Sequence, residues 1–196
     1  MKIIISIDDG SVYDFKVVNI LSEYGFKGVF YIAPNYQDHH PLSDKQIKIL
    51  SETQEIGGHT LNHCMLTLAK EKDAYREIIC GKNYLENIIG KKITKFAYPK
   101  GWHNDMMHKL VKKAGFTEAR TMRQWITDVS GYDKLELPIT FHVYPDKLNR
   151  FDQMFEAGKI GGYFHLACHS WEIEKFDMWE KFENIIKKLS YENKNT

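Results

Sequence analysis

The stretch KIIISIDDG, residues 2–10, is the part of the sequence from which the fold can be worked out. Its apolar run, residues 2–7, predicts a buried strand, and Asp8 and Asp9 follow directly. Adjacent side chains of a regular strand point to opposite faces. Both carboxylates therefore serve one site only if the strand ends there and the backbone turns, which Gly10 permits. The alternative is an ordinary Asp-Gly turn with solvated acids, the simpler interpretation of this stretch alone.

Outward from this strand, short apolar runs alternate with longer amphipathic segments. This alternation predicts strands joined by single helices, and so a mostly parallel sheet with right-handed crossovers, open or closed as a barrel. The expected strands cover residues 2–7, 28–33, 55–59, 93–98, 116–121, 137–144 and 162–169. The expected helical segments cover 14–24, 43–53 with Ser43 as cap, 68–89, 105–114, about 151–157, and 173–189.

The chain is expected to form one domain. Its 196 residues suit one ordinary domain, and no composition shift or repeat divides them. We expect an α/β domain over residues 1–191 and a frayed C-terminal tail over 192–196. Side chains with chemistry to offer fall at the carboxyl ends of expected strands, where α/β barrels place their active sites. They are Asp8, Asp9, His59, Tyr98 and His169.

Composition excludes several classes of protein. A chain with 43% hydrophobic, 13% aromatic and 27% charged residues is typical of a compact fold and not of a disordered one. Lys and Arg number 27 against 26 Asp and Glu, so no overall field favours nucleic acid. No apolar run approaches the ~20 residues that a transmembrane helix needs. We therefore expect neither a nucleic-acid partner nor a transmembrane segment.

The cysteines and the first residues bear on the compartment. Cys64, Cys80 and Cys168 leave at least one thiol unpaired, and none belongs to a C-x-x-C pair, so a reducing compartment is the simpler interpretation. The apolar run at residues 2–7 is too short for a signal-peptide core and lacks a small-residue cleavage site. We therefore expect a cytoplasmic protein.

A second motif, HTLNH at residues 59–63, is entered through Gly57 and Gly58. Histidines at i and i+4 share one face of a helical turn, and neutral imidazoles at that spacing are good zinc ligands. An aspartate from another strand end would complete a three-ligand site that keeps a position open to water. The alternative is a pair of histidines satisfied by backbone carbonyls. The double glycine and the spacing favour metal binding.

Two later segments add candidate groups. In FAYPKGW, residues 96–102, Pro and Gly flank Lys100 and fix a bend whose backbone amide could serve as an oxyanion donor. Taken alone, an ordinary turn between strand and helix is the simpler interpretation. In the segment 162–171, strand alternation places His169 nearest the strand end, where it could act as a general acid, although a lone histidine is more often structural.

Taken in order, SIDDG (6–10), HTLNH (59–63), FAYPKG (96–101) and HSW (169–171) resemble the motifs of the polysaccharide deacetylase family, which has the NodB homology domain and is like carbohydrate esterase family 4. The resemblance covers most of the chain. It implies an incomplete, distorted (β/α) barrel of mostly parallel strands. A complete eight-stranded barrel typically needs ~250 residues, so an incomplete one fits this length.

The resemblance also implies a function: a metal-dependent hydrolase that removes N-acetyl groups from amino sugars or glycans. Asp9, His59 and His63 would hold one divalent ion, usually zinc in this family. Asp8 would be the general base, and His169 would protonate the departing amine. The expected substrate-binding residues are Tyr98, Pro99, Lys100 and Trp171.

The sequence departs from the family's pattern in three places, one of which is the last motif, where His169-Ser170 replaces the more usual histidine-aspartate. The third motif usually begins with an arginine that pairs with the base carboxylate, but Ala97 stands there, and Arg120 or Arg123 is the expected substitute. The fourth motif, with an aspartate and a tryptophan that support the catalytic histidine, has no clear counterpart, although Trp125 and Asp128 lie in the corresponding region.

Two other functions stay open at this point. One is deacylation or deformylation of another small or lipid-linked amide. The other is that of a noncatalytic relative that binds carbohydrate. In either a deacetylase or a carbohydrate-binding protein, aromatic rings near the mouth of the site could stack on a sugar. The candidates are Tyr98, Trp102, Trp171 and His142.

Overall fold

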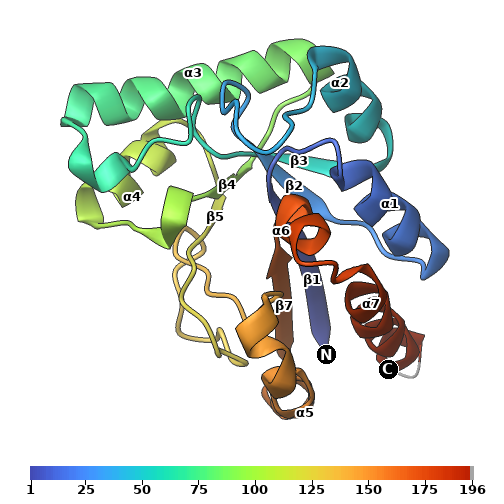
Figure 1. Ribbon diagram of the computed structural model, residues 1–196. Helices are drawn as coiled ribbons and strands as arrows, with labels where there is room; N and C mark the ends of the chain where they lie inside the picture. Colours follow the sequence, from blue (N-terminus) through green and yellow to red (C-terminus); the bar gives the residue numbers. More distant parts are fainter. Residues whose placement is uncertain (195–196) are drawn as a thin grey trace.

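The computed structural model describes residues 1–194, in which seven parallel strands form one curled sheet (Figure 1). The strands are β1 (Lys2–Asp9), β2 (Val29–Ile32), β3 (Glu55–Gly58), β4 (Lys95–Ala97), β5 (Glu118–Arg120), β6 (Phe141–His142) and β7 (Tyr163–Cys168). Their order across the sheet is β5-β4-β3-β2-β1-β7-β6. Because β5 and β6 remain edge strands, the barrel is incomplete, as expected from the sequence.

The two faces of the curled sheet differ in character. The quoted strand, β1, lies between β2 and β7, and its Ile5 and Ile7 pack into the main hydrophobic core. Ser6 and Asp8, which alternate with these isoleucines along the strand, point to the other face, inside the curl. There Ser6 Oγ and His165 Nε2 share a hydrogen bond, and Arg120 donates to Asp8. The strand periodicity thus separates an apolar outer face from a polar interior that leads to the site.

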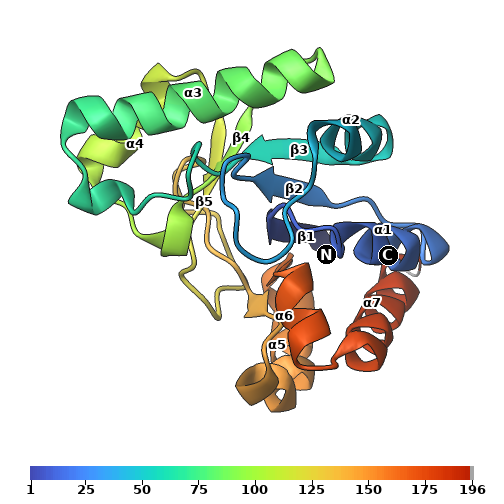
Figure 2. The same cartoon turned by 45° about the horizontal axis from the view of Figure 1, so that its top comes forward.

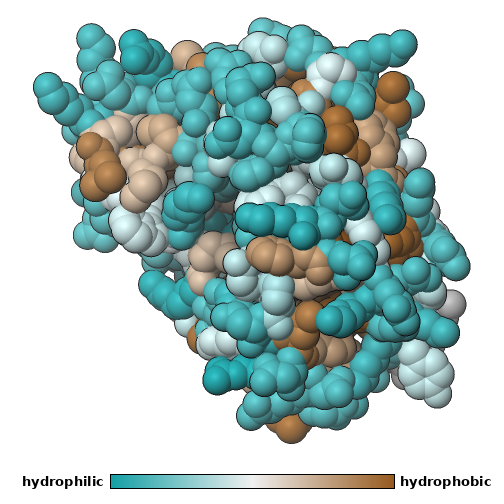
Figure 3. Space-filling view, viewed as in Figure 1, coloured by the Kyte–Doolittle hydropathy of each residue, from teal (hydrophilic) through white to brown (hydrophobic). Residues whose placement is uncertain are grey.

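Helices cover the outside of the sheet (Figures 1 and 2). They are α1 (Asp14–Glu23), α2 (Asp44–Thr53), α3 (Glu71–Ile89), α4 (Asp105–Lys113), α5 (Phe151–Gly161), α6 (Ser170–Lys175) and α7 (Trp179–Lys194), with short 3₁₀ helices η1 (Leu66–Leu68), η2 (Pro99–Gly101) and η3 (Pro145–Arg150). Polar side chains cover most of the face in Figure 3. Helix ends follow the expected signals, because Ser43 forms a capping box at α2 and Gly90 ends α3 in the left-handed conformation.

Several element boundaries differ from the expectation. The helix expected over 68–89 begins at Glu71, because η1 occupies Leu66–Leu68. The helix expected over 173–189 is two helices, α6 and α7, since Asp177 between them has a left-handed φ of 48°. The strand expected over 137–144 is only Phe141–His142.

The C-terminal end also differs from the expectation. Helix α7 continues to Lys194, so residues 192–194 are helical where a frayed tail was expected, and residues 195–196 lie outside the described part of the chain. None of the helices within residues 1–194 combines the length and apolar character needed to cross a membrane. Cys64, Cys80 and Cys168 are free thiols.

Candidate active site

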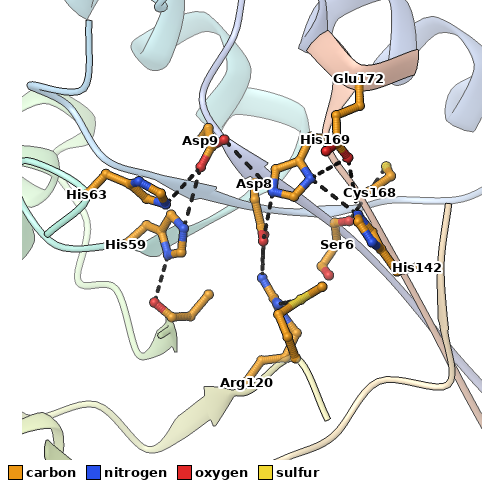
Figure 4. A network of polar contacts seen from close by, with 12 residues as sticks. Ser6, Asp8, Asp9, His59, His63, Arg120, His142, Cys168, His169 and Glu172 are labelled. Carbon is orange, nitrogen blue, oxygen red and sulfur yellow. Dashed lines mark hydrogen bonds and ion pairs between the residues drawn. The ribbon is translucent and has the colours of Figure 1, made fainter. Parts of the chain in front are cut away.

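The expected site residues converge at the carboxyl ends of the central strands, around a cavity of about 360 Å³ (Figure 4). Strands β1 and β6 bring side chains to it, and so do the segments that follow β3, β4, β5 and β7. The cavity is lined by Asp8, Asp9, His59, His63, Tyr98, Lys100, Met122, Gln124, His142, Lys147, His169, Trp171 and Glu172. The sheet topology therefore assembles residues that lie more than 160 positions apart in the sequence.

Both carboxylates of the first motif reach this cavity because β1 ends in a sharp turn. Asp9 itself has a φ of 79° and Gly10 a φ of 86°. An added Cβ at Gly10 would lie 2.8 Å from Cγ2 of Ile32, so only glycine fits without rearrangement. The condition stated from the sequence, that the strand must end and turn at the two aspartates, is met.

The histidine motif reaches the site in a different way from the one expected. The helical-turn interpretation of residues 59–63 is wrong, because Thr60 and His63 have φ values of 66° and 54° and the segment contains no helix. Helix α3 holds the segment instead. Its Gly81 lets the Thr60 backbone approach so closely that an added Cβ would lie 2.6 Å from the carbonyl, and its Glu77 accepts hydrogen bonds from the backbone and side chain of Asn62.

Three potential ligand atoms face one another at the end of β1. Asp9 Oδ1 lies 3.5 Å from His59 Nε2 and 3.4 Å from His63 Nε2. His59 Nδ1 is 2.7 Å from the carbonyl oxygen of Ala97, which can only accept, so Nδ1 carries a proton and Nε2 is the ring atom that faces Asp9. Asp9 Oδ1 is buried and has no hydrogen-bond partner among the described residues.

This arrangement fits a divalent cation. Ligands held tetrahedrally about 2.0–2.1 Å from zinc lie about 3.4 Å from one another, close to the separations from Asp9 Oδ1. Burial lowers the pKa of His63 to about 4, which keeps its imidazole neutral. Burial raises the pKa of Asp9, but His59 and then His169 lower it more, so the carboxyl is ionised. Neutral imidazoles and an ionised carboxylate are the protonation states that metal binding requires.

Trp171 fixes the orientation of the Asp9 carboxylate, a contact that the sequence did not indicate. Its Nε1 donates a 2.9 Å hydrogen bond to Asp9 Oδ2, which leaves Oδ1 facing the two histidines. One face of the indole is covered by His39, with ring centroids 3.6 Å apart and planes 7° from parallel. Trp171 lines the cavity as expected, but that covered face cannot also stack on a ligand.

A Trp171→Phe variant tests this orientation. We expect metal affinity to fall about 10- to 100-fold, because partners that orient a metal ligand have effects of that size and phenylalanine lacks the N–H donor. Titration against a chelating dye would measure the affinity. Trp102→Phe is the matched control, since Trp102 is 56% exposed and lies outside the cavity lining. Equal affinities in the two variants would contradict the role of Trp171.

Arg120 of β5 is the cation that pairs with Asp8. The guanidinium is buried, and its Nη2 contacts both carboxylate oxygens of Asp8. Arg123, the other candidate, instead lies 5.9 Å from the ring centroid of Tyr132. Burial raises the pKa of Asp8, but Arg120 and then His59 and His169 lower it more, so the carboxylate is ionised.

Sheet register explains how Arg120 substitutes for an arginine at position 97. Ala97 on β4 and Arg120 on β5 are Cα partners in the parallel pairing. A side chain at either position therefore starts from the same level of the sheet. The positive charge beside Asp8 therefore comes from the neighbouring strand, β5 instead of β4, at the same height in the sheet.

His169 is the candidate acid, and Glu172 holds it. His169 Nδ1 lies 2.8 Å from Glu172 Oε2, while Nε2 lies 3.9 Å from an oxygen of each of the two aspartates. Burial lowers the pKa of His169, but the hydrogen bond to Glu172 and the charges of Asp9 and Asp8 raise it to about 9. The ring is therefore protonated at neutral pH.

A second imidazole shares the same carboxylate oxygen. His142 Nε2 is 3.3 Å from Glu172 Oε2. Burial lowers the pKa of His142, so this ring is neutral while His169 carries the charge. His142, His169 and Glu172 also place ligand atoms close enough together to hold a metal, which makes them a second set to distinguish from Asp9, His59 and His63.

The residues expected to support His169 do not reach it. Trp125 packs against Phe141, and Asp128 is exposed and accepts a hydrogen bond from the backbone of Ser130. Glu172, three residues after His169, replaces them. The signal was the i, i+3 spacing of a histidine and an acid across the start of a helix, which brings the two side chains together.

The expected substrate-binding residues differ in whether they line the cavity. Lys100 lines the cavity from the turn η2, with a φ of 58°. Tyr98 lines the cavity with a wholly buried side chain whose hydroxyl donates to the carbonyl of Leu135, and contact of its ring with a sugar stays a prediction. Pro99 is buried outside the lining, and its contact with substrate also stays a prediction. Trp102 lies outside the lining as well. His142 lines the cavity.

Comparisons with known proteins show which family this sequence is similar to. The family model described as polysaccharide deacetylase matches residues 1–119. The chain is 31% identical over 116 residues to a peptidoglycan-N-acetylglucosamine deacetylase of Bacillus cereus, covering 58% of this chain and 53% of the relative. It is 26% identical over 97 residues to the peptidoglycan-N-acetylmuramic acid deacetylase PdaC of Bacillus subtilis, covering 50% of this chain and 20% of that one.

A solved structure extends the likeness in fold to almost the whole chain. A putative polysaccharide deacetylase from Mycobacterium smegmatis superposes with a TM-score of 0.75 at 18% identity, covering 96% of this chain and 83% of that one. The chain spans about half the length of the first curated relative and a fifth of the second.

Proposed function

The chain belongs to the polysaccharide deacetylase family, and from this premise we propose that it is a zinc-dependent hydrolase that removes acetyl groups from N-acetylated amino sugars. Family membership supports hydrolysis of the acetamide bond in a carbohydrate. The observation that carries the proposal is the buried Asp9 Oδ1, which has no hydrogen-bond partner among residues 1–194 and faces two imidazole nitrogens beside a candidate base and a candidate acid.

Asp9, His59 and His63 would hold the cation. A divalent ion there supplies Lewis acidity, which polarises an acetyl carbonyl and makes water a stronger nucleophile at neutral pH. Asp8 would accept a proton from the attacking water. Its pairing with Arg120 keeps it ionised and fixes the orientation of its oxygens. Lys100 is a residue of the cavity lining, and its backbone N–H would donate to the oxyanion.

His169 would complete the reaction from its place beside the two aspartates. Its Nε2 faces the two aspartates, and Glu172 holds Nδ1. A protonated ring can transfer the Nε2 proton to the nitrogen of the amide as the carbon–nitrogen bond breaks. The products are acetate and a free amino sugar, and one water is consumed. Asp8 and His169 thus have the ionised and protonated states that their respective roles require.

Acetate release from chito-oligosaccharides and from peptidoglycan fragments tests the proposal. We expect release that a chelator abolishes and added zinc restores. Turnover of a formyl or other acyl amide with no acetate from any sugar would favour the deacylase alternative. Glycan binding that Asp8→Asn leaves unchanged, in a protein without detectable turnover of any amide, would favour the noncatalytic alternative.

A Glu172→Gln variant tests the acid. We expect kcat to fall about 100-fold, the lower end of what a general acid contributes, with metal content unchanged. Because Glu172 raises the pKa of His169, its loss lowers that pKa. A general acid stops working as pH rises through its pKa, so the alkaline limb of the kcat profile should move to lower pH. Glu174→Gln, on the same helix, is the control, and an unmoved limb in Glu172→Gln would contradict the assignment.

A further inference from the structure

Two lysines in the cavity wall have no acidic partner among the described residues. Lys100 extends from the turn η2 and is exposed, and Lys147 of η3 is half-buried. Lys147 Nζ lies 3.4 Å from His142 Nδ1, which uses one of its three hydrogens. In the part of the chain that the structure describes, neither ammonium group forms an ion pair with a carboxylate.

Every acidic side chain of the cavity, in contrast, already faces a partner. Arg120 pairs with Asp8, and Glu172 Oε2 lies 2.8 Å from His169 Nδ1 and 3.3 Å from His142 Nε2. Asp9 Oδ1 faces the Nε2 atoms of His59 and His63. Lys100 and Lys147 therefore add positive charge that no acidic side chain of the lining engages, although the whole chain has a net charge of only +1. A concave site with walls of low dielectric constant concentrates the field of such charges.

The wall that carries the first lysine is built to meet a polar ligand. Gly101 packs so tightly on Met122 that an added Cβ would lie 2.4 Å from its backbone nitrogen, which fixes the turn bearing Lys100. Beyond Met122, Gln124 Oε1 lies buried against the cavity and finds no hydrogen-bond partner within residues 1–194. A buried acceptor of this kind is costly unless a bound molecule donates to it.

We propose that Lys100 and Lys147 form a subsite for a carboxylate group of the substrate, with Gln124 accepting a hydrogen bond from a neighbouring hydroxyl. The preferred substrate is then an N-acetylated amino sugar that carries a carboxylate, not a neutral one. This inference rests on the proposed deacetylase function.

A matched pair of substrates isolates the charge. A disaccharide containing N-acetylmuramic acid and the methyl ester of its lactyl group differ in one negative charge and little else. We expect kcat/KM of the wild-type zinc enzyme to be at least about fivefold higher for the acid, in keeping with partly exposed ion pairs, and the ratio to fall with added salt. In the Lys100→Met/Lys147→Met variant the ratio should be close to one. Because each variant is its own reference, a general loss of activity does not affect the ratio.

The control is Lys181→Met/Lys187→Met, which removes two exposed charges from α7 and should keep the wild-type ratio. The inference is overturned if the wild type does not prefer the acid, or if the double variant of the cavity lysines still does. Weaker inhibition by acetate in that variant, with an unchanged ratio, would assign the lysines to the product and also overturn it. Absence of acetate from both sugars and from neutral oligosaccharides would instead refute the deacetylase function.

Discussion

A His63→Asn variant is expected to lose its divalent ion and at least about 10³-fold in kcat/KM, since a cation contributes several kcal/mol of transition-state stabilisation. Only Asp9 and His59 would remain as ligands. Asparagine tolerates the left-handed backbone of residue 63, whose φ is 54°, and its shorter side chain does not bring an amide to the position of Nε2. Elemental analysis after dialysis and acetate release in added zinc would measure both losses.

His40→Asn is the matched control. His40 is an exposed histidine in the loop beside the cavity, and its φ of 57° imposes the same backbone conformation. It lies outside the set of ligand atoms around Asp9. We expect this variant to keep both metal and turnover. A His63→Asn protein that binds the ion and works as well as His40→Asn would refute the assignment of His63.

An Arg120→Met variant should be the most damaging change outside the metal ligands. Breaking a buried ion pair from one side typically costs about 3–5 kcal/mol of folding free energy, and here it leaves the Asp8 carboxylate buried without its partner. The pKa of Asp8 should rise, because Arg120 is the largest influence that lowers it. A general base works only above its pKa, so the acid limb of the kcat profile should move to higher pH.

Two further variants separate stability from catalysis. Asp8→Asn/Arg120→Met removes both charges, and we expect it to recover part of the unfolding free energy but none of the turnover. Ala97→Arg/Arg120→Ala returns the guanidinium to the neighbouring strand at the same register, and we expect it to regain turnover relative to Arg120→Ala. Denaturant unfolding and acetate release measure the two properties. A fully active Arg120→Met protein would contradict the role given to this arginine.

Much of the fold follows from short-range patterns in the sequence. The isoleucines before Asp8 form a strand buried between two parallel neighbours, as an apolar run predicts, although Ser6 within that run faces the polar interior. Glycines and capping residues then allow most helix ends to be predicted to within a few residues of their positions in the structure. Where the prediction was wrong, a local exception overrode the pattern. The left-handed Asp177 splits the last predicted helix although the amphipathic repeat continues across it.

The site is less predictable because long-range packing decides its geometry. The spacing of His59 and His63 suggested a helical turn, but their approach depends on the close packing of α3 at Gly81. Two arginines were equal candidates from sequence position, and only the register of β4 and β5 selects Arg120. The contact from Trp171 to Asp9 joins residues 162 positions apart, so no local pattern reports it.

The measurement that tests this account most directly is an anomalous-difference map at the zinc edge from a crystal of the protein grown with one equivalent of zinc. We expect one strong peak about 2.0–2.2 Å from Asp9 Oδ1, His59 Nε2 and His63 Nε2. We also expect Asp8 and His169 to lie near that peak without ligating it. A peak among His142, His169 and Glu172, or none near Asp9, would contradict the central claim.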